Sequence, residues 1–196
     1  FCCDNHGQSV YARLLQTRQN PSAFINAFMA DGQSISGSGT LAMYLEFCLN
    51  HDFSRRADEQ LAMQLLQQGA DAFGASIEGS PPLHLCVRLG WQRLGQTLLA
   101  LGTDPNAVDV AGLTALHYAA QLGRVVLLKE LLMSGADPER RAANGQSPLG
   151  LALLNSDAEV QHWLDWPDWR LPKRRLHAGD LISAVLAKDQ DAVKRL

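Results

Sequence analysis

The chain has 196 residues, of which 46% are hydrophobic and 19% are charged, and this balance predicts a globular protein rather than a disordered one. The formal net charge is −3, which does not favour nucleic acid as the partner, because domains that bind nucleic acid carry a basic face. The sequence has no run of about 18 apolar residues, so no transmembrane helix is predicted.

The N-terminal part predicts two helix pairs. In chain order, the expected helices are 10–17 and 21–30 for one pair, then 40–49 and 57–68 for the next. A loop rich in Ser and Gly separates the pairs over residues 32–39, and the second pair carries an insertion near 50–56. Whether residues 1–35 form a true repeat stays open.

Further along the chain, the sequence repeats itself with a period of 33 residues. One marker opens each copy, and a second marker closes the helix pair that precedes it. The opening markers are Gly79-Ser80-Pro81-Pro82-Leu83-His84, Gly112-Leu113-Thr114-Ala115-Leu116-His117 and Gly145-Gln146-Ser147-Pro148-Leu149-Gly150, and the closing markers are Gly69-Ala70-Asp71, Gly102-Thr103-Asp104 and Gly135-Ala136-Asp137. Two markers with the same period predict a repeat protein.

Each copy predicts a pair of short helices. Thr114 can cap a first helix through its hydroxyl, and Ser147 is followed by a proline at the first helical position. Gly90 and Gly123 supply the left-handed residue that ends a first helix, and Gly135 ends a second helix. Helices of about two turns are unstable alone in water, so the copies are expected to stack on one another.

The second copy, from Gly-Leu-Thr-Ala-Leu-His-Tyr-Ala-Ala-Gln-Leu-Gly at 112–123 to Leu-Leu-Met-Ser-Gly-Ala-Asp at 131–137, closely resembles the ankyrin repeat. The resemblance is strong over 79–164 and weaker outside. It implies an all-α ankyrin-repeat solenoid of about five helix pairs with hairpin-like loops. Divergent N-terminal repeats would occupy 1–78, and an irregular loop with a partial repeat would occupy 165–196.

That C-terminal segment has two features of its own. Trp166 and Trp169 either cover the apolar flank of the third copy or anchor a partner. Residues 180–196 resemble another repeat at a constant offset of 65, in which Leu181, Ala184, Val185, Val193 and Leu196 take the places of Leu116, Ala119, Ala120, Leu128 and Leu131.

The histidines and cysteines favour structural roles. His84 and His117 occupy the same motif position, where the resemblance implies bonds to backbone and hydroxyl groups between repeats; the third copy has Gly150 there. Because no Cys or His pair has the spacing of zinc ligands, no metal and no cofactor are predicted. Cys48 and Cys86 lie in apolar helical patterns and are predicted to be buried free thiols.

Three weaker patterns are better explained by loops and solvated surface than by a functional site. The run 37–40, Gly-Ser-Gly-Thr, lacks the lysine of a phosphate-binding loop, and a loop with Thr40 as helix cap explains it better. Glu46 with His51 and Asp52 indicates a solvated loop rather than an acid/base pair. The basic run 173–175 is expected to be solvated as well.

The resemblance also carries over partner-contacting positions, residue by residue. At the loop tips these are Ile77, Glu78 and Ser80, then Val110, Ala111 and Leu113, then Ala143, Asn144 and Gln146; on the first helices they are Arg88, Leu89, Gln121, Leu122, Leu154 and Asn155. Leu89 and Leu122 occupy one motif position in successive copies, and we expect them to form an exposed apolar stripe. Polar residues that include Arg141 would surround this stripe at the edge of the interface. The alternative is that Leu89 and Leu122 pack under the neighbouring repeat.

These patterns predict a non-enzymatic protein-binding module, for example an inhibitor or immunity protein that caps a toxin or an enzyme. The alternative is a targeting or regulatory segment of a longer enzyme or toxin-related protein. The partner is expected to be a protein of unknown identity, and the chain is expected to be a monomer or weakly self-associating. We expect a cytoplasmic location. Because the chain starts at Phe1 and continues with Cys2 and Cys3, a periplasmic or lipid-anchored location after leader removal is the alternative.

Overall fold

The computed structural model describes residues 38–50, 56–155, 157–165 and 185. Its contacts divide the chain into two compact units, Phe1–Thr103 (unit 1) and Asp104–Leu196 (unit 2). Within the described residues all regular structure is helical, with eight helices and no strand. The predicted all-α class is therefore confirmed.

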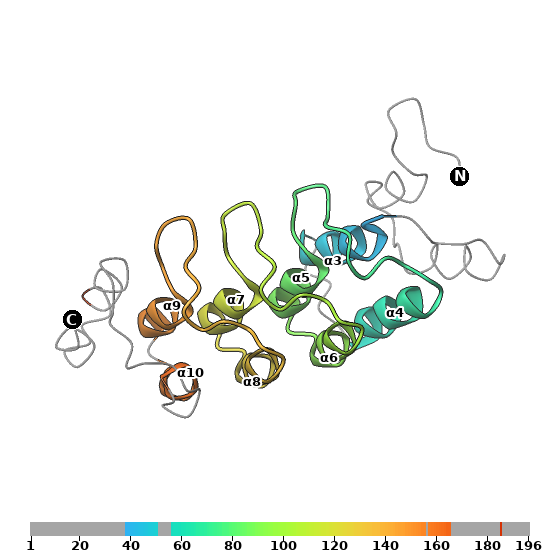
Figure 1. The fold of residues 1–196 in the computed structure, drawn as a ribbon. Coiled ribbons are helices and arrows are strands. Elements are labelled where there is room, and N and C mark those ends of the chain that lie inside the picture. Colours follow the sequence, from blue (N-terminus) through green and yellow to red (C-terminus); the bar gives the residue numbers. More distant parts are fainter. Residues whose placement is uncertain (1–37, 51–55, 156, 166–184, 186–196) are drawn as a thin grey trace. The chain divides into compact units, whose positions relative to one another are not determined.

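Unit 1 contains two helix pairs in the described residues. They are α3 (Thr40–Asn50) with α4 (Arg56–Gln67), and α5 (Pro82–Leu89) with α6 (Gln92–Ala100). The first helices α3 and α5 pack against each other, the second helices α4 and α6 do the same, and each first helix also packs on its own second helix (Figure 1). The helices predicted over 40–49 and 57–68 are confirmed to within one residue at each end.

Unit 2 repeats this two-layer arrangement. Its pairs are α7 (Ala115–Gln121) with α8 (Val125–Met133), and α9 (Pro148–Asn155) with α10 (Ala158–Leu164). Helix α7 packs on α8 and α9, and α10 packs on α8 and α9. Each helix is short, so its apolar side chains must be covered by the neighbouring pair, as stacking of the copies predicts.

The first helices end as their glycines predict. Gly90 has φ 76°, a left-handed conformation, and its N–H donates to the carbonyls of Cys86 and Val87. Because glycine has no Cβ, it adopts this conformation without the steric cost that other residues meet. Gly123, with φ 64°, is also left-handed and lies one residue beyond Leu122, the C-terminal cap of α7.

Small and large apolar side chains alternate in the core. Leu116, Ala119 and Ala120 on α7 are completely buried, and the two alanines leave room for the neighbouring helices. Cys48 and Cys86 are buried and free, as predicted. Burial raises the pKa of the Cys48 thiol to about 12, so this group stays protonated and unreactive at neutral pH.

Several predictions fall outside the described residues: the helices over 10–17 and 21–30, most of the 32–39 loop and of the 50–56 insertion, and the tryptophans and basic run beyond 165. Within 180–196 the structure describes Val185 alone. Its side chain is helical but 56% exposed, whereas Ala120 is 0% exposed. The predicted core position of Val185 is therefore wrong, because a side chain so exposed does not pack between helices.

Candidate functional site

Each copy opens with a five-residue turn of the same geometry. The turns span residues 76–80, 109–113 and 142–146, and in each one the first N–H donates to the fifth carbonyl at 2.9–3.0 Å. The fourth residue is a glycine with φ between 73° and 80°, and its N–H donates to the first carbonyl. This is a hairpin loop of three residues closed by a left-handed glycine. The second and third residues therefore project outward, and we call them the tip.

An aspartate holds the second turn together. Asp109 Oδ1 accepts hydrogen bonds from the N–H groups of Ala111 at 2.9 Å and Leu113 at 3.0 Å. Its Oδ2 accepts a 2.6 Å hydrogen bond from the hydroxyl of Tyr118, which lies on α7. The carboxylate thus fixes the tip Val110-Ala111 relative to its own helix.

The other two turns are braced by different side chains. In the third turn, Asn144 Oδ1 accepts from the N–H of Gln146 at 3.0 Å, and Arg141 donates to the carbonyl of Gly145 at 2.8 Å. In the first turn, the hydroxyl of Ser76 donates to Glu46 Oε1 at 2.8 Å. Desolvation by burial raises the pKa of the Glu46 carboxyl, although the Ser76 hydrogen bond opposes that shift. All three tips are therefore held in one conformation before any partner arrives.

The second and third turns are also joined to each other. Ala143 N–H donates to the carbonyl of Ala111 at 3.1 Å, and the two loops run side by side in Figure 1. A Cβ on Gly112 would come within 2.8 Å of the nitrogen of Ala143, closer than real Cβ atoms approach. The glycine is therefore required for the two loops to pair.

His117 connects the second copy with the third. Its Nδ1 accepts a 3.1 Å hydrogen bond from the N–H of Thr114, so the ring proton is assigned to Nε2, which lies 3.2 Å from the carbonyl of Gln146. The implied structural role of this histidine is confirmed. In the preceding copy, Pro81 stands in place of Thr114 and has neither an N–H nor a hydroxyl, so it cannot give the Nδ1 of His84 the bonds that Thr114 gives to His117.

In unit 1, the carboxylate of Asp71 accepts hydrogen bonds from backbone N–H groups, as Asp109 does in the second turn. Partial burial would raise the pKa of its carboxyl, but hydrogen bonds from the N–H groups of Phe73, Gly39 and Gly74 outweigh that effect and hold the pKa below its usual value. The N–H of Gly39 thus already faces a carboxylate, which fits the structural interpretation of the 37–40 run. The predicted cap role of Thr40 is wrong, because Thr40 is itself the first residue of α3, and its hydroxyl accepts from the N–H of Asp71 at 3.4 Å.

Most of the predicted partner-contacting residues are accessible. The exposed ones are Ile77, Glu78, Val110, Ala111, Gln121, Leu122, Ala143, Asn144, Leu154 and Asn155, and the half-buried ones are Ser80, Arg88, Leu113 and Gln146. Val110 is 84% exposed and Ile77 66%, so two tips carry apolar side chains in full contact with water. In unit 2, the side chain of Asn155 donates to the carbonyl of Gln121 and joins the ends of α9 and α7.

Leu89 contradicts the expectation of an exposed apolar stripe. Its side chain is only 8% exposed, whereas Leu122, at the same motif position, is 45% exposed. Leu89 is the last residue of α5 and Leu122 is the C-terminal cap of α7, so a shared motif position does not fix how the side chain packs. Leu89 is therefore a core residue.

Sequence reasoning missed one exposed aromatic residue. Phe73 is 63% exposed in the loop that follows α4. One period later stands Asn106, whose side chain donates to the carbonyl of Gly135 at 2.9 Å and accepts from the N–H of Asp137 at 2.7 Å. Comparison of these positions would have drawn attention to Phe73, because an aromatic side chain cannot make the two bonds of an asparagine.

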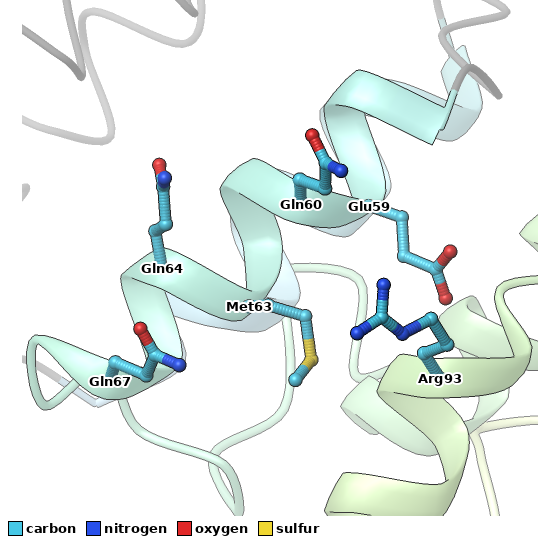
Figure 2. Close-up of a pocket in the computed structure, with 6 residues that line it drawn as sticks. All are labelled: Glu59, Gln60, Met63, Gln64, Gln67 and Arg93. Atoms are coloured by element: carbon cyan, nitrogen blue, oxygen red, sulfur yellow. The ribbon is translucent and has the colours of Figure 1, made fainter.

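A groove lies between the second helices of unit 1. Figure 2 shows Glu59 and Met63 of α4 directed toward Arg93 of α6, with Gln64 pointing away. Glu59 Oε1 also accepts from the N–H of Leu94 at 3.2 Å and so caps the start of α6. The groove contains none of the predicted partner-contacting residues.

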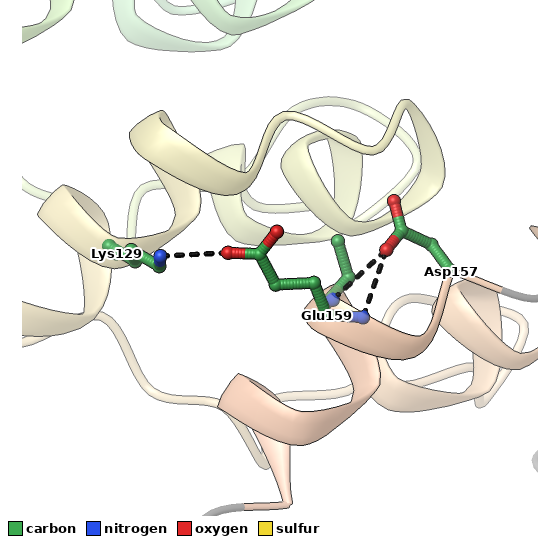
Figure 3. Close-up of polar contacts among 4 residues, drawn as sticks. Lys129, Asp157 and Glu159 are labelled. Atoms are coloured by element: carbon green, nitrogen blue, oxygen red, sulfur yellow. Dashed lines mark hydrogen bonds and ion pairs between the residues drawn. The ribbon is translucent and has the colours of Figure 1, made fainter.

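A polar cluster joins α8 and α10 in unit 2 (Figure 3). The ammonium of Lys129 lies 2.9 Å from Glu159 Oε1 and 4.7 Å from the centroid of the Trp163 ring. Asp157 caps α10 by accepting from the N–H groups of Glu159 and Val160. Ion pairs this exposed stabilise by about 0–1 kcal/mol, so we assign the cluster to helix packing.

Metal sites and membrane spans were considered only for the part of the chain that the structure describes. No group of three or more His, Cys, Asp or Glu side chains lies close enough together to hold a metal ion. No described helix combines the length and apolar character needed to cross a membrane.

The chain was also compared with known proteins. A family model described as "Ankyrin repeats (3 copies)" matches residues 51–142 and again residues 83–164. The search of curated proteins gave no match. The matched region covers more than half of the chain and contains helices α4 to α10, with the turns between them. The chain therefore belongs to the ankyrin-repeat family.

Proposed function

We propose that the chain is a non-enzymatic protein-binding module whose partner contacts the turn tips and the C-terminal ends of the first helices. Ankyrin repeats are generally protein-interaction modules, and the family is generally non-catalytic. The observation that carries the proposal is the set of tips. Three turns of identical hydrogen bonding present exposed residues, and Ile77 and Val110 among them are apolar and lie in water.

The rigidity of the tips supports binding. An apolar side chain in water costs free energy, and a partner that covers it recovers on the order of 25 cal/mol per Å². A flexible loop would lose part of that gain on ordering, whereas the bonds of Asp109 already order the second turn. Three finer statements stay predictions: that the chain is an inhibitor or immunity protein, that it is alternatively a targeting or regulatory segment, and that it is cytoplasmic.

An affinity capture with three baits tests the proposal. The first is the unaltered chain, and the second carries Val110→Glu and Leu122→Glu, at positions 84% and 45% exposed. The third, a matched control, carries Met133→Glu and Val126→Glu on α8, at positions 81% and 45% exposed in the same unit. The second and third baits add the same charge at similar exposure, so only the location differs between them.

We expect proteins captured by the first and third baits to be absent from the second. Circular dichroism on each bait confirms that it is folded. Equal capture by all three baits would contradict the proposal. Loss from the third bait alone would place the interface on the second helices instead.

A further inference from the structure

The part of unit 2 that would contact the partner carries no charge. Helix α7 reads Ala-Leu-His-Tyr-Ala-Ala-Gln and α9 reads Pro-Leu-Gly-Leu-Ala-Leu-Leu-Asn, and neither contains Asp, Glu, Lys or Arg. The tips of the second and third turns are Val-Ala and Ala-Asn. We call six exposed residues of these tips and helix ends the neutral face: Val110, Ala111, Leu122, Asn144, Leu154 and Asn155.

Two charged residues of unit 2, Asp109 and Arg141, lie beside the tips, and the other described ones lie outside the tips and the first helices. Asp109 is bound to two N–H groups and to Tyr118, and Arg141 donates to the carbonyl of Gly145. The other described charged residues of unit 2 lie before the second turn, on or beside α8 and α10, or in the loop after α8: Asp104, Arg124, Lys129, Glu130, Asp137, Glu139, Arg140, Asp157, Glu159 and Asp165.

The side-chain amides of the neutral face bond to residues beside it. The amide of Asn144 donates to the side chain of Gln146 at 2.7 Å and accepts from its N–H. The amide of Asn155 donates to the carbonyl of Gln121. A partner that covers these amides can therefore leave these hydrogen bonds in place, and the six residues bring no charge that it would have to compensate.

From this we propose that the neutral face binds an extended protein segment whose contacting side chains are apolar or uncharged. This inference rests on the proposed function and adds the chemistry of the partner. A charged side chain buried against these six residues would lose its hydration and meet no opposite charge among them, which disfavours charged segments. Helix α7 has seven residues and so is ~10 Å long, and an extended segment of about eight residues, at ~3.3 Å each, can reach from a tip past the helix end.

The experiment uses a library of random twelve-residue peptides displayed on phage and the whole chain as the target. Selection is run on the unaltered chain, on the Val110→Glu, Leu122→Glu variant and on the Met133→Glu, Val126→Glu control. Peptides that need the neutral face bind the first and the third but not the second. Their affinities are then measured at 50 and 500 mM NaCl, since salt screens interactions between charges.

We expect these peptides to be enriched in apolar and uncharged residues, and their affinity to change less than about twofold between the two salt concentrations. Face-dependent peptides rich in Lys, Arg, Asp or Glu, or an affinity that falls tenfold in high salt, would overturn the inference and leave the proposed function intact. If every selected peptide binds the variant as well as the unaltered chain, the face is not a binding site, and the proposed function fails with it.

Discussion

The imidazole of His117 shows how one side chain can join two repeats. The ring is completely buried, accepts from the N–H of Thr114 and lies within hydrogen-bonding distance of the carbonyl of Gln146. Replacing it by a smaller apolar side chain would leave both backbone groups without this partner. Unsatisfied buried polar groups cost about 1–3 kcal/mol each, so a single residue carries a large part of the stability of this junction.

We therefore expect His117→Ala to lower the free energy of unfolding by about 2–4 kcal/mol. In His117→Asn the shorter amide oxygen can still accept from Thr114 but cannot reach Gln146, so this variant should lose about half as much. Urea denaturation followed by circular dichroism measures both. Equal losses in the two variants would show that the bond at Thr114 does not contribute.

Asp71 should make stability depend on acid pH. Hydrogen bonds from Phe73, Gly39 and Gly74 outweigh partial burial and hold the pKa of its carboxyl below the ordinary value. A carboxyl with a lowered folded pKa contributes stability that is fully present above the unfolded pKa of about 3.9, and the contribution disappears as the pH falls through the folded pKa.

The measurement is the difference in unfolding free energy between the unaltered chain and Asp71→Asn. We expect this difference to favour the unaltered chain at pH 6 and to shrink as the pH falls from 5 to 2. Taking the difference removes the opposite contribution of Glu46, whose pKa is raised chiefly by burial. A difference that stays constant over that pH range would contradict the role of Asp71.

At the scale of elements, the turns determine how neighbouring copies meet. The three turns share their hydrogen bonds and their glycine, but the glycines differ in surroundings. A Cβ on Gly112 would lie 2.8 Å from the nitrogen of Ala143, whereas a Cβ on Gly145 would meet no atom within 4 Å. Both have positive φ, at 73° and 79°, so an alanine costs similar backbone strain at either position.

This pair allows a matched measurement. Gly145→Ala should destabilise the chain by about 1–2 kcal/mol through backbone strain alone. Gly112→Ala should cost at least about 1 kcal/mol more, because its methyl group forces apart the bond between Ala143 and Ala111. Thermal denaturation of the two variants in parallel gives the difference. Equal destabilisation would mean that the contact between the turns contributes nothing to stability.

At the scale of the whole molecule, stacking decides which apolar side chains reach water. Leu89 and Leu122 share a motif position, yet they are 8% and 45% exposed. A charge at a buried position must lose its hydration without a partner, which destabilises the fold by several kcal/mol, whereas a charge at a solvent-facing position does not.

Accordingly, Leu89→Glu should lower the unfolding free energy by about 3 kcal/mol or more, and Leu122→Glu by less than about 1 kcal/mol. Both are measured by urea titration, with Met133→Glu as a control for surface charge at a position 81% exposed. A large loss from Leu122→Glu would show that this residue supports the core, and it would then be unsuitable as a test of binding.

The repeat itself could be predicted from local sequence. The helices over 40–49 and 57–68, the turn glycines, the buried thiols of Cys48 and Cys86 and the structural His117 all follow from spacing and from conformational preferences that act within one copy. Each tip residue was located because the opening glycine defines its place in the turn.

The amino-acid sequence by itself therefore determined the family, the period and the positions of the tips, since these depend on neighbours within 33 residues. Only the tertiary structure decided the burial of Leu89, the exposure of Phe73 and the pairing of the second and third turns. These depend on contacts with residues of neighbouring copies, which the motif of a single copy does not encode. Leu89 and Leu122 share a motif position, yet the first is buried and the second is 45% exposed.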